Sequence, residues 1–476
     1  MLIICYAIVY LLMVHSDRHH IKFRAATLKE KKIAIKEAVM SNAISAPRQG
    51  GARKILSVTS GNFLEMYDFM VFGYYATAIA KTFFPGDDPF ASLMLTLMTF
   101  GAGFLMRPLG AIILGAYIDH HGRRKGLLLT LGLMAIGTLT IALVPGYATL
   151  GMAAPILILL GRLLQGFSAG VELGGVSVYL AEVAPKGRKG FYVSWQSGSQ
   201  QVAVIFAALL GLALNHLLAK EAVTEWGWRI PFVVGCMIVP FLFWIRRMME
   251  ETDEFKQRKH HPAMRDIMRS VASNWALVLA GMLMVVTTTV MFYMITAFTP
   301  TFGKTVLMMN DKQSFLVTLF VGISNLFWLP LMGALSDRVG RRPLLILFTL
   351  LMIVTAWPVL HWLVGSPSFN HLLEAELWLS FLYASYNGAM VVYLEEIMPA
   401  EVRASGFSLA YSLATALFGG FTPAISSYLI HATGDKAMPG VWLTFAAVCG
   451  LIGTLCIGKL VKRYRYAHQG KPAEAL

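Results

Sequence analysis

Residues 115–124, with the sequence GAYIDHHGRR, recur as GALSDRVGRR at residues 333–342. A second motif behaves in the same way, because YLAEVAP at residues 179–185 returns as YLEEIMP at residues 393–399. The two motifs keep their order and nearly the same separation. One unit of the chain has therefore been duplicated, which predicts two halves of similar structure.

The segments around these motifs are strongly apolar. Hydrophobic residues make up 57% of the 476 residues and charged residues 14%, whereas soluble proteins carry about 25% charged residues. Stretches of about 20 apolar residues can cross a bilayer as helices. We expect twelve such helices, six in each half, at residues 57–83, 91–117, 126–145, 152–180, 191–216, 229–247, 274–301, 314–335, 343–365, 373–398, 405–431 and 438–461. The predicted fold is an all-α membrane protein of two six-helix bundles related by a pseudo-two-fold axis along the membrane normal, a plan of many secondary transporters.

More polar segments divide the chain around these bundles. We expect an N-terminal cytoplasmic segment at residues 1–56, bundles at 57–247 and 274–463, a charged cytoplasmic linker at 248–273 and a tail at 464–476. Residues 1–39 begin with a short apolar run that lacks the preceding positive charge of a signal peptide. We interpret them as an upstream extension of a protein that begins at Met40.

Basic residues concentrate on one side of the predicted helices. Of the 40 Lys and Arg residues, three lie within helices or at their rims and five lie on the side opposite the N-terminus: Arg107, Arg162 and Arg229, and then Lys81, Lys220, Lys304, Lys312 and Lys436. Because Lys and Arg are enriched in cytoplasmic loops, we expect both termini in the cytoplasm and a multi-pass protein of the bacterial inner membrane. The basic residues form short clusters rather than one face, which argues against nucleic acid as a partner.

Several motifs resemble the major facilitator superfamily. The two G-x-x-x-D-x-x-G-R-R loops are similar to its signature, and GRLLQG at residues 161–166 resembles its sugar-porter branch. GNFLEMYDF at residues 61–69 resembles the G-N-x-x-E-W-Y-D-F segment of the metabolite:proton symporter family, with Met66 in place of Trp, and RPLG from Arg107 is similar to its R-P-x-G motif. Within that family the chain looks closest to citrate and tricarballylate proton symporters.

Three polar residues recur at every third position of the first predicted helix: Asn62, Glu65 and Asp68. They share one face, and charged side chains at bilayer depth need a cavity or a partner. At about 1.5 Å per residue, Asp68 and Arg162 lie at similar depth, and the sugar-porter resemblance implies that they pair. We predict that Asp68 carries the coupling proton with Arg162 as its partner, and that Glu65 is an alternative or second proton site. A static ion pair is the structural alternative.

Arg107 precedes a proline deep in the second predicted helix. Pro108 frees a backbone carbonyl, and a guanidinium can hold both oxygens of a carboxylate. We expect Arg107 to bind an acidic substrate, with pairing to Glu65 or capping of a neighbouring helix as alternatives. Polar residues on other helices are expected to complete the substrate site, although each alone could be structural: Asn62, Gln196, Ser199, Gln200, Thr288, Tyr293 and Asn387.

Charged residues of the repeated motifs lie at the predicted cytoplasmic helix ends. They are Asp119, Arg123, Glu182, Asp337, Arg341 and Glu396. At these positions they can link helices and lock the outward-facing state. We therefore assign them to gating rather than to substrate binding.

The predicted function is proton-coupled uptake of a tricarboxylate, citrate or tricarballylate, by alternating access. Moving an anion into a negative cytoplasm costs about 2.3 kcal/mol per charge per 100 mV, so accumulation of a trianion needs coupling to protons. Another organic acid such as 2-oxoglutarate, or a zwitterionic osmolyte, is the alternative substrate.

Other classes of function fit the sequence poorly. No P-loop of an ATP-driven pump is present, and the scattered histidines do not suggest an enzyme. The four cysteines lie in apolar segments without metal-ligand spacing. We expect no metal and no cofactor besides the coupling protons, and a monomer whose partners are the organic anion and membrane lipid.

Overall fold

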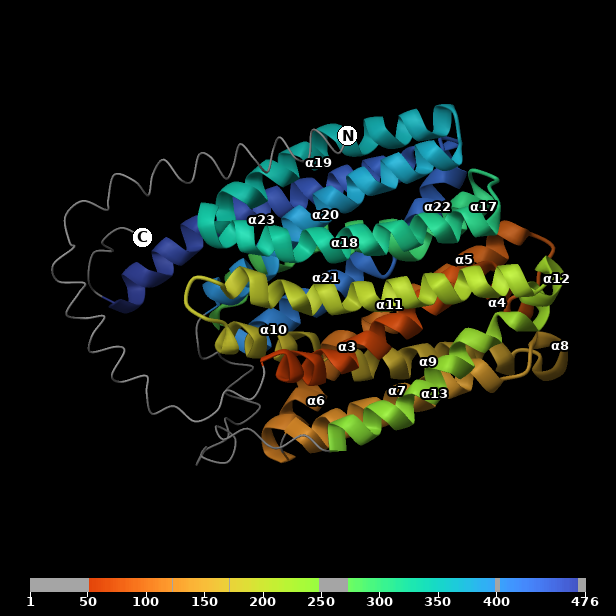
Figure 1. Ribbon diagram of the computed structural model, residues 1–476, viewed down its shortest axis with the longest axis horizontal. Coiled ribbons are helices and arrows are strands. Elements are labelled where there is room, and N and C mark those ends of the chain that lie inside the picture. Colours follow the sequence, from red (N-terminus) through yellow and green to blue (C-terminus); the bar gives the residue numbers. More distant parts are fainter. Residues whose placement is uncertain (1–50, 122, 171, 248–272, 399–402, 470–476) are drawn as a thin grey trace.

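The computed structural model describes residues 51–121, 123–170, 172–247, 273–398 and 403–469, which are almost entirely helical (Figure 1). The first half contains α3 (Gly51–Tyr74), α4 (Ala76–Phe83), α5 (Pro89–Leu105), α6 (Arg107–His121), α7 (Arg123–Leu143), α8 (Tyr147–Leu150), α9 (Ala153–Ala169), α10 (Glu172–Val183), α11 (Lys189–Leu217), α12 (Lys220–Ala222), the π turn η2 (Val223–Gly227) and α13 (Arg229–Arg247). The second half contains α16 (Trp275–Tyr293), the π turn η3 (Met294–Phe298), α17 (Thr299–Thr305), α18 (Asp311–Val339), α19 (Arg341–Gly365), α20 (Phe369–Ile397), α21 (Arg403–Ala414), the π turn η5 (Thr415–Gly419), α22 (Thr422–Thr433) and α23 (Met438–Gln469). The predictions for residues 1–50, including a start at Met40, and for residues 248–272 lie outside the described residues.

All twelve predicted segments fall on helices of the described chain. Nine helical runs in the described part are long and apolar enough to cross a membrane, or ten if the bent pair Lys220–Gly227 and Arg229–Trp244 counts as one span. Of the other two predicted segments, the fourth contains a shorter apolar helix, Ala153–Ala169. The first contains α3, which carries Glu65 and Asp68.

Two spans of the second half are interrupted by a π turn. The π turn η3 separates α16 from α17, and the π turn η5 separates α21 from α22. Pro300 and Pro423 follow these turns in the first residues of the next helices, where proline is tolerated. Because π turns within helices are often found at functional positions, both breaks mark places where a span can bend.

Small residues bring the arginine-bearing helices of the first half close together. A side-chain carbon placed on Gly166 of α9 would strike the carbonyl oxygen of Gly103 in α5, and one on Gly170 would strike the carbonyl oxygen of Arg107. Only glycine allows backbones to approach this closely. The start of α6 is therefore held against α9, the helix that carries Arg162.

The two halves lie side by side along their whole length, with α11 packed against α18 (Figure 1). A side-chain carbon on Gly190 of α11 would meet the carbonyl oxygen of Gly333 of α18, so these helices also touch through their backbones. We call the end of the molecule where α13 finishes and α16 begins the linker end, and the opposite end the far end.

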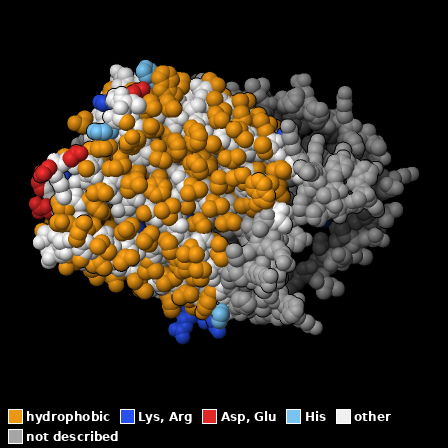
Figure 2. Space-filling view, turned by 180° about the vertical axis from the view of Figure 1, so that it is seen from behind, with side chains coloured by type: hydrophobic (Ala, Val, Ile, Leu, Met, Phe, Trp, Pro, Cys, Tyr) orange, Lys and Arg blue, Asp and Glu red, His pale blue; other side chains and the backbone are white. Residues whose placement is uncertain are grey.

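The side of the molecule is apolar. Large hydrophobic residues are strongly exposed on several helices, for example Leu143 at 65%, Met237 at 72% and Val354 at 68%. Figure 2 shows hydrophobic side chains over most of the described surface, with charged side chains at its rim. Monomeric soluble proteins rarely expose contiguous apolar patches larger than a few hundred Å². Together with the spanning helices, this surface identifies a multi-pass membrane protein.

Candidate functional site

A buried ion pair joins α3 to α6. The guanidinium of Arg107 donates a hydrogen bond from Nη2 to Oε1 of Glu65, and the exposed fractions of the two side chains are 3% and 1%. The guanidinium carbon of Arg107 lies 5.6 Å from the centre of the Phe104 ring, and that ring lies 5.1 Å from the ring of Tyr293 in the second half. The pair is thus next to the contact between the halves.

Asp68, one turn further along α3, is fully buried. Its Oδ2 accepts a hydrogen bond from the hydroxyl of Thr138 on α7, whereas its Oδ1 has no hydrogen-bond partner among the described residues. The Thr138 hydroxyl also accepts a hydrogen bond of 3.0 Å from Nε2 of Gln165 on α9. A buried carboxylate oxygen without a hydrogen-bond partner is energetically costly.

Arg162 lies at the other end of the same chain of contacts. Its Nη1 donates to Oε1 of Gln165 at 2.7 Å. Its guanidinium carbon lies 4.4, 4.6 and 5.3 Å from the ring centres of Phe69, Phe72 and Phe100. These cation–π contacts and the Gln165 oxygen stabilise a charge that is fully removed from solvent.

The direct pairing predicted between Asp68 and Arg162 is not formed in this conformation. Gln165 and Thr138 lie between the two groups and connect them by hydrogen bonds. The physical reason is that the guanidinium packs among three aromatic rings and binds the amide three residues further along its own helix. Gln165 and Thr138 were not predicted as site residues, although Gln165 follows Arg162 by the three residues that place side chains on one helix face.

The polar residues predicted for substrate binding form a second group around α11. Nδ2 of Asn62 donates to the carbonyl oxygen of Gln196 at 2.9 Å and to the hydroxyl of Ser199 at 3.0 Å, and Gln200 donates to Oδ1 of Asn62 at 3.3 Å. The structure therefore brings Asn62, Gln196 and Gln200 together.

Hydrogen bonds extend this group into the second half. Asn387 of α20 donates from Nδ2 to the hydroxyl of Ser197 at 2.8 Å. Asn325 of α18 donates to Oε1 of Gln201 at 3.1 Å and accepts a bond of 2.8 Å from Ser380. The link between Gln201 and Asn325 was not predicted, because single polar residues in apolar helices give no signal of their partners.

These central groups are closed in the described conformation. Glu65, Asp68, Arg107 and Arg162 are each no more than 3% exposed, and Tyr293 is also buried. A pocket does lie at the far end, between α3, α4, α11, α17 and α18, where Tyr74, Tyr75, Thr301 and Phe315 contribute to its lining. The cavity expected beside these charged side chains is therefore not open to solvent in the described conformation.

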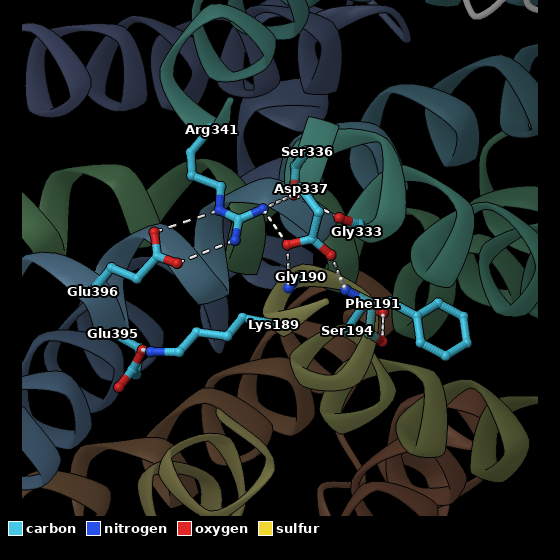
Figure 3. Close-up of polar contacts among 10 residues, drawn as sticks. All are labelled: Lys189, Gly190, Phe191, Ser194, Gly333, Ser336, Asp337, Arg341, Glu395 and Glu396. Atoms are coloured by element: carbon cyan, nitrogen blue, oxygen red, sulfur yellow. Dashed lines mark hydrogen bonds and ion pairs between the residues drawn. The ribbon is translucent and has the colours of Figure 1, made fainter. Parts of the chain in front are cut away.

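The linker end carries a network of charges between the halves (Figure 3). Asp337 at the end of α18 accepts hydrogen bonds from the backbone N–H groups of Gly190 and Phe191 at 2.8 and 3.1 Å. Arg341 pairs with Asp337 at 2.8 Å and with Glu396 at 3.1 Å. Three predicted gating residues, Asp337, Arg341 and Glu396, thus meet in one place and connect α18, α19 and α20 to the start of α11.

A second linker-end contact was not predicted. Glu395 of α20 is paired with Lys189 at 4.0 Å and with Arg403 at 3.3 Å, and Lys189 belongs to the other half. In the sequence, the only indication of this contact was that the second copy of the motif, YLEEIMP, contains two adjacent acids. Of the remaining predicted gating residues, Glu182 is exposed on α10. The side chains of Asp119 and Arg123 are not among those that the structure describes.

Buried charges within apolar helical bundles are typical of a membrane transporter. A family model described as "Sugar (and other) transporter" matches residues 54–464. The chain belongs to this family, and it is a transporter rather than an enzyme.

Named relatives place it more closely within the family. The chain is 64% identical over 407 residues to a citrate-proton symporter of Klebsiella pneumoniae, covering 85% of this chain and 92% of the relative. It is 58% identical over 424 residues to a citrate-proton symporter of Salmonella typhi, covering 89% and 98%. A crystal structure of a D-xylose-proton symporter superimposes with a TM-score of 0.68 at 20% identity, covering 86% of this chain and 97% of that one. This last likeness shows the major facilitator fold.

Proposed function

We propose that the protein takes up citrate together with protons by alternating access. The observation that carries the proposal is the buried pair of Glu65 and Arg107, because it places a guanidinium that can bind a carboxylate and a titratable acid together, next to the contact between the halves. The two relatives named as citrate-proton symporters support citrate as the substrate.

Competition for Arg107 couples the substrate to a proton. While Glu65 is ionised, its carboxylate occupies the guanidinium that a citrate carboxylate needs. Protonation of Glu65 removes this competitor, so the proton and the substrate favour each other's binding. Asn62, Gln196, Gln200, Tyr293 and Asn387 supply hydrogen bonds to the remaining carboxylates and the hydroxyl of citrate once the halves separate.

Asp68 is the main proton carrier in this scheme. A proton on its carboxyl group neutralises a fully buried charge, and the bridge through Thr138 and Gln165 transmits the change to Arg162. The three protons that balance a citrate trianion cannot all be carried by one acid. Glu65 is the second carrier.

Alternation uses the network at the linker end. We assign this end to the cytoplasm, with both termini there, because the basic residues concentrate on this side. In the described conformation Asp337, Arg341 and Glu396 hold the linker end shut, and inward opening must break the contacts of Asp337 with the start of α11.

The architecture of the proposal is the one expected from the repeat. In this proposal twelve spans form bundles at residues 57–247 and 274–463, joined by a cytoplasmic linker. The protein works as a monomer in the bacterial inner membrane, with protons as the coupling ion and no cofactor.

Uptake into proteoliposomes tests this function. Purified protein should accumulate labelled citrate against its gradient when the lumen is alkaline, and a protonophore should abolish the accumulation. Tricarballylate and 2-oxoglutarate serve as competitors. Accumulation of 2-oxoglutarate or of glycine betaine without accumulation of citrate would overturn citrate as the substrate. Citrate uptake that the protonophore does not reduce would overturn the coupling to protons.

A further inference from the structure

Besides the ion-paired Glu395, the second half buries another acid, away from the site described above. Glu376 lies seven residues after the start of α20 and is 1% exposed. At about 1.5 Å per residue this places it roughly 10 Å inside the helix from the far end. An ionisable side chain at such depth is expensive and marks a functional position by default.

The hydrogen bonding of Glu376 is incomplete. Its Oε1 lies 2.9 Å from the hydroxyl of Thr299, and its Oε2 is buried without a hydrogen-bond partner among the described residues. The elements around it carry other titratable groups at this end. Lys304 and Asp311 pair with each other at 3.2 Å, His371 contacts Ser366, His361 stacks on Trp357, and Glu374 is exposed. None of these groups forms an ion pair or hydrogen bond with Glu376 in the described part of the chain.

Thr299 connects this acid to the π turn η3. Its hydroxyl oxygen lies 3.0 Å from the carbonyl oxygen of Ile295 and 3.3 Å from that of Met294, both within the π turn. A hydroxyl has one hydrogen to donate. It can therefore satisfy either the Glu376 carboxylate or a carbonyl of the π turn, but not both at once.

The protonation state of Glu376 decides between these two arrangements. An ionised Glu376 can only accept hydrogen bonds. Thr299 must then donate its hydroxyl hydrogen to the carboxylate, and the π-turn carbonyl oxygens receive no hydrogen bond from this hydroxyl. A protonated Glu376 can donate its own O–H to the Thr299 oxygen, which releases the threonine hydrogen to the carbonyl of Ile295. The proton forms one new O–H bond on the carboxyl group, and no other covalent bond changes.

The far-end pocket lies beside the start of α17. It is lined by Pro300 and Thr301, the two residues that directly follow Thr299. Because of this closeness along the chain, the pocket is the entry for the proton in the arrangement proposed below.

We propose that Glu376 is a further proton-binding site of this transporter, in the second half, and that Thr299 couples its occupancy to the π turn between α16 and α17. This proton site goes beyond the proposed function. Only its transport test, the number of protons carried per citrate, rests on that function. It adds a third acid to the two of the first half, which matches the three protons that would neutralise a citrate trianion.

The first test is independent of transport. Infrared spectra of the purified protein, taken without substrate from about pH 5 to about pH 9, should contain a protonated-carboxyl band that disappears as the pH rises and that is absent in Glu376→Gln. Glu374→Gln on the exposed face of the same helix is the matched control and should keep the band. If the intensity of the Glu376 band stays constant across this range, the proposal is overturned, because the carboxyl group would then remain protonated at every pH tested.

Thr299 variants test the coupling and remain informative if Glu376→Gln fails to fold. Thr299→Val removes the donor to the ionised carboxylate, so the band should persist to higher pH. Thr299→Ser keeps the hydroxyl and should titrate as the wild type does. A titration unchanged in Thr299→Val would overturn the role of the threonine.

The transport readout is the number of protons carried per citrate in proteoliposomes, measured with a luminal pH dye and labelled citrate. We expect Glu376→Gln to lower this ratio by about one, and the same ratio as in the wild type would overturn the proposal. If the wild type itself carries no protons with citrate, the proposed function fails, whereas the infrared titration still decides whether Glu376 binds a proton.

Discussion

Asp337 of the second half accepts a hydrogen bond of 2.8 Å from the backbone N–H of Gly190 in the first half. The carboxylate faces the N-terminus of α11, where unpaired N–H groups and the helix dipole favour negative charge. The neighbouring Phe191 N–H binds the second carboxylate oxygen at 3.1 Å. One side chain thus bridges the two halves at the linker end, which we propose faces the cytoplasm.

Replacement of Asp337 by Asn should favour the inward-open state. The variant loses the charge that binds two N–H groups, and charged hydrogen bonds are worth about 1.5–3 kcal/mol. We expect about a tenfold rise in maleimide labelling of a cysteine introduced at Ser194, in a background without the native cysteines. Arg338→Gln, an exposed neighbour on α18, is the control. Equal labelling of both variants would contradict a gating role for Asp337.

Glu65→Gln should flatten the pH dependence of citrate binding. In the proposed scheme only the ionised form of Glu65 competes with citrate for Arg107, so citrate binding should weaken as the pH increases. A neutral glutamine cannot compete in this way at any pH. Calorimetry at several pH values should give affinities that differ by about tenfold between the two proteins at the alkaline end. The exposed Glu225→Gln serves as the control, and parallel pH profiles would remove Glu65 from the coupling.

Asp68→Asn should separate accumulation from exchange. The amide cannot bind a coupling proton, but it keeps the size of the side chain and a partner for Thr138. We expect accumulation against a gradient to be lost, while exchange of citrate down its gradient continues. Asp87→Asn, at an exposed position of the far end, should behave as the wild type does. Undiminished accumulation by the Asp68 variant would exclude this residue as the carrier.

Gln165→Leu should destabilise the protein through Arg162. The substitution removes the amide oxygen that lies 2.7 Å from the buried guanidinium and the amide donor to Thr138. Loss of a buried partner costs about 1–3 kcal/mol, which should lower the thermal unfolding midpoint of the purified protein. The exposed Gln313→Leu on α18 controls for the change of residue type. An unchanged midpoint would mean that the aromatic rings and the Phe100 carbonyl are sufficient to hold Arg162.

Much of the candidate site could be anticipated from motif positions. Asp337, Arg341 and Glu396 lie in the repeated motifs, and the structure brings them together at the linker end. Helical periodicity predicted one face for Asn62, Glu65 and Asp68, and in the structure their hydrogen-bond partners lie on three different helices, α11, α6 and α7. Residues outside any motif, such as Glu376 and Thr138, had no comparable signal, because one polar residue in an apolar helix does not indicate which neighbour it contacts.

The sequence alone determined the helical fold, the duplication and the family, because hydropathy and short motifs are local properties of the chain. Only the tertiary structure decided which buried groups pair. Arg107 contacts Glu65 across 42 residues of sequence, and Thr138 contacts Asp68 across 70. The reason is physical: a helix rotated by a fraction of a turn exchanges one polar partner for another of similar energy, so the packing of glycines and aromatic rings selects among them.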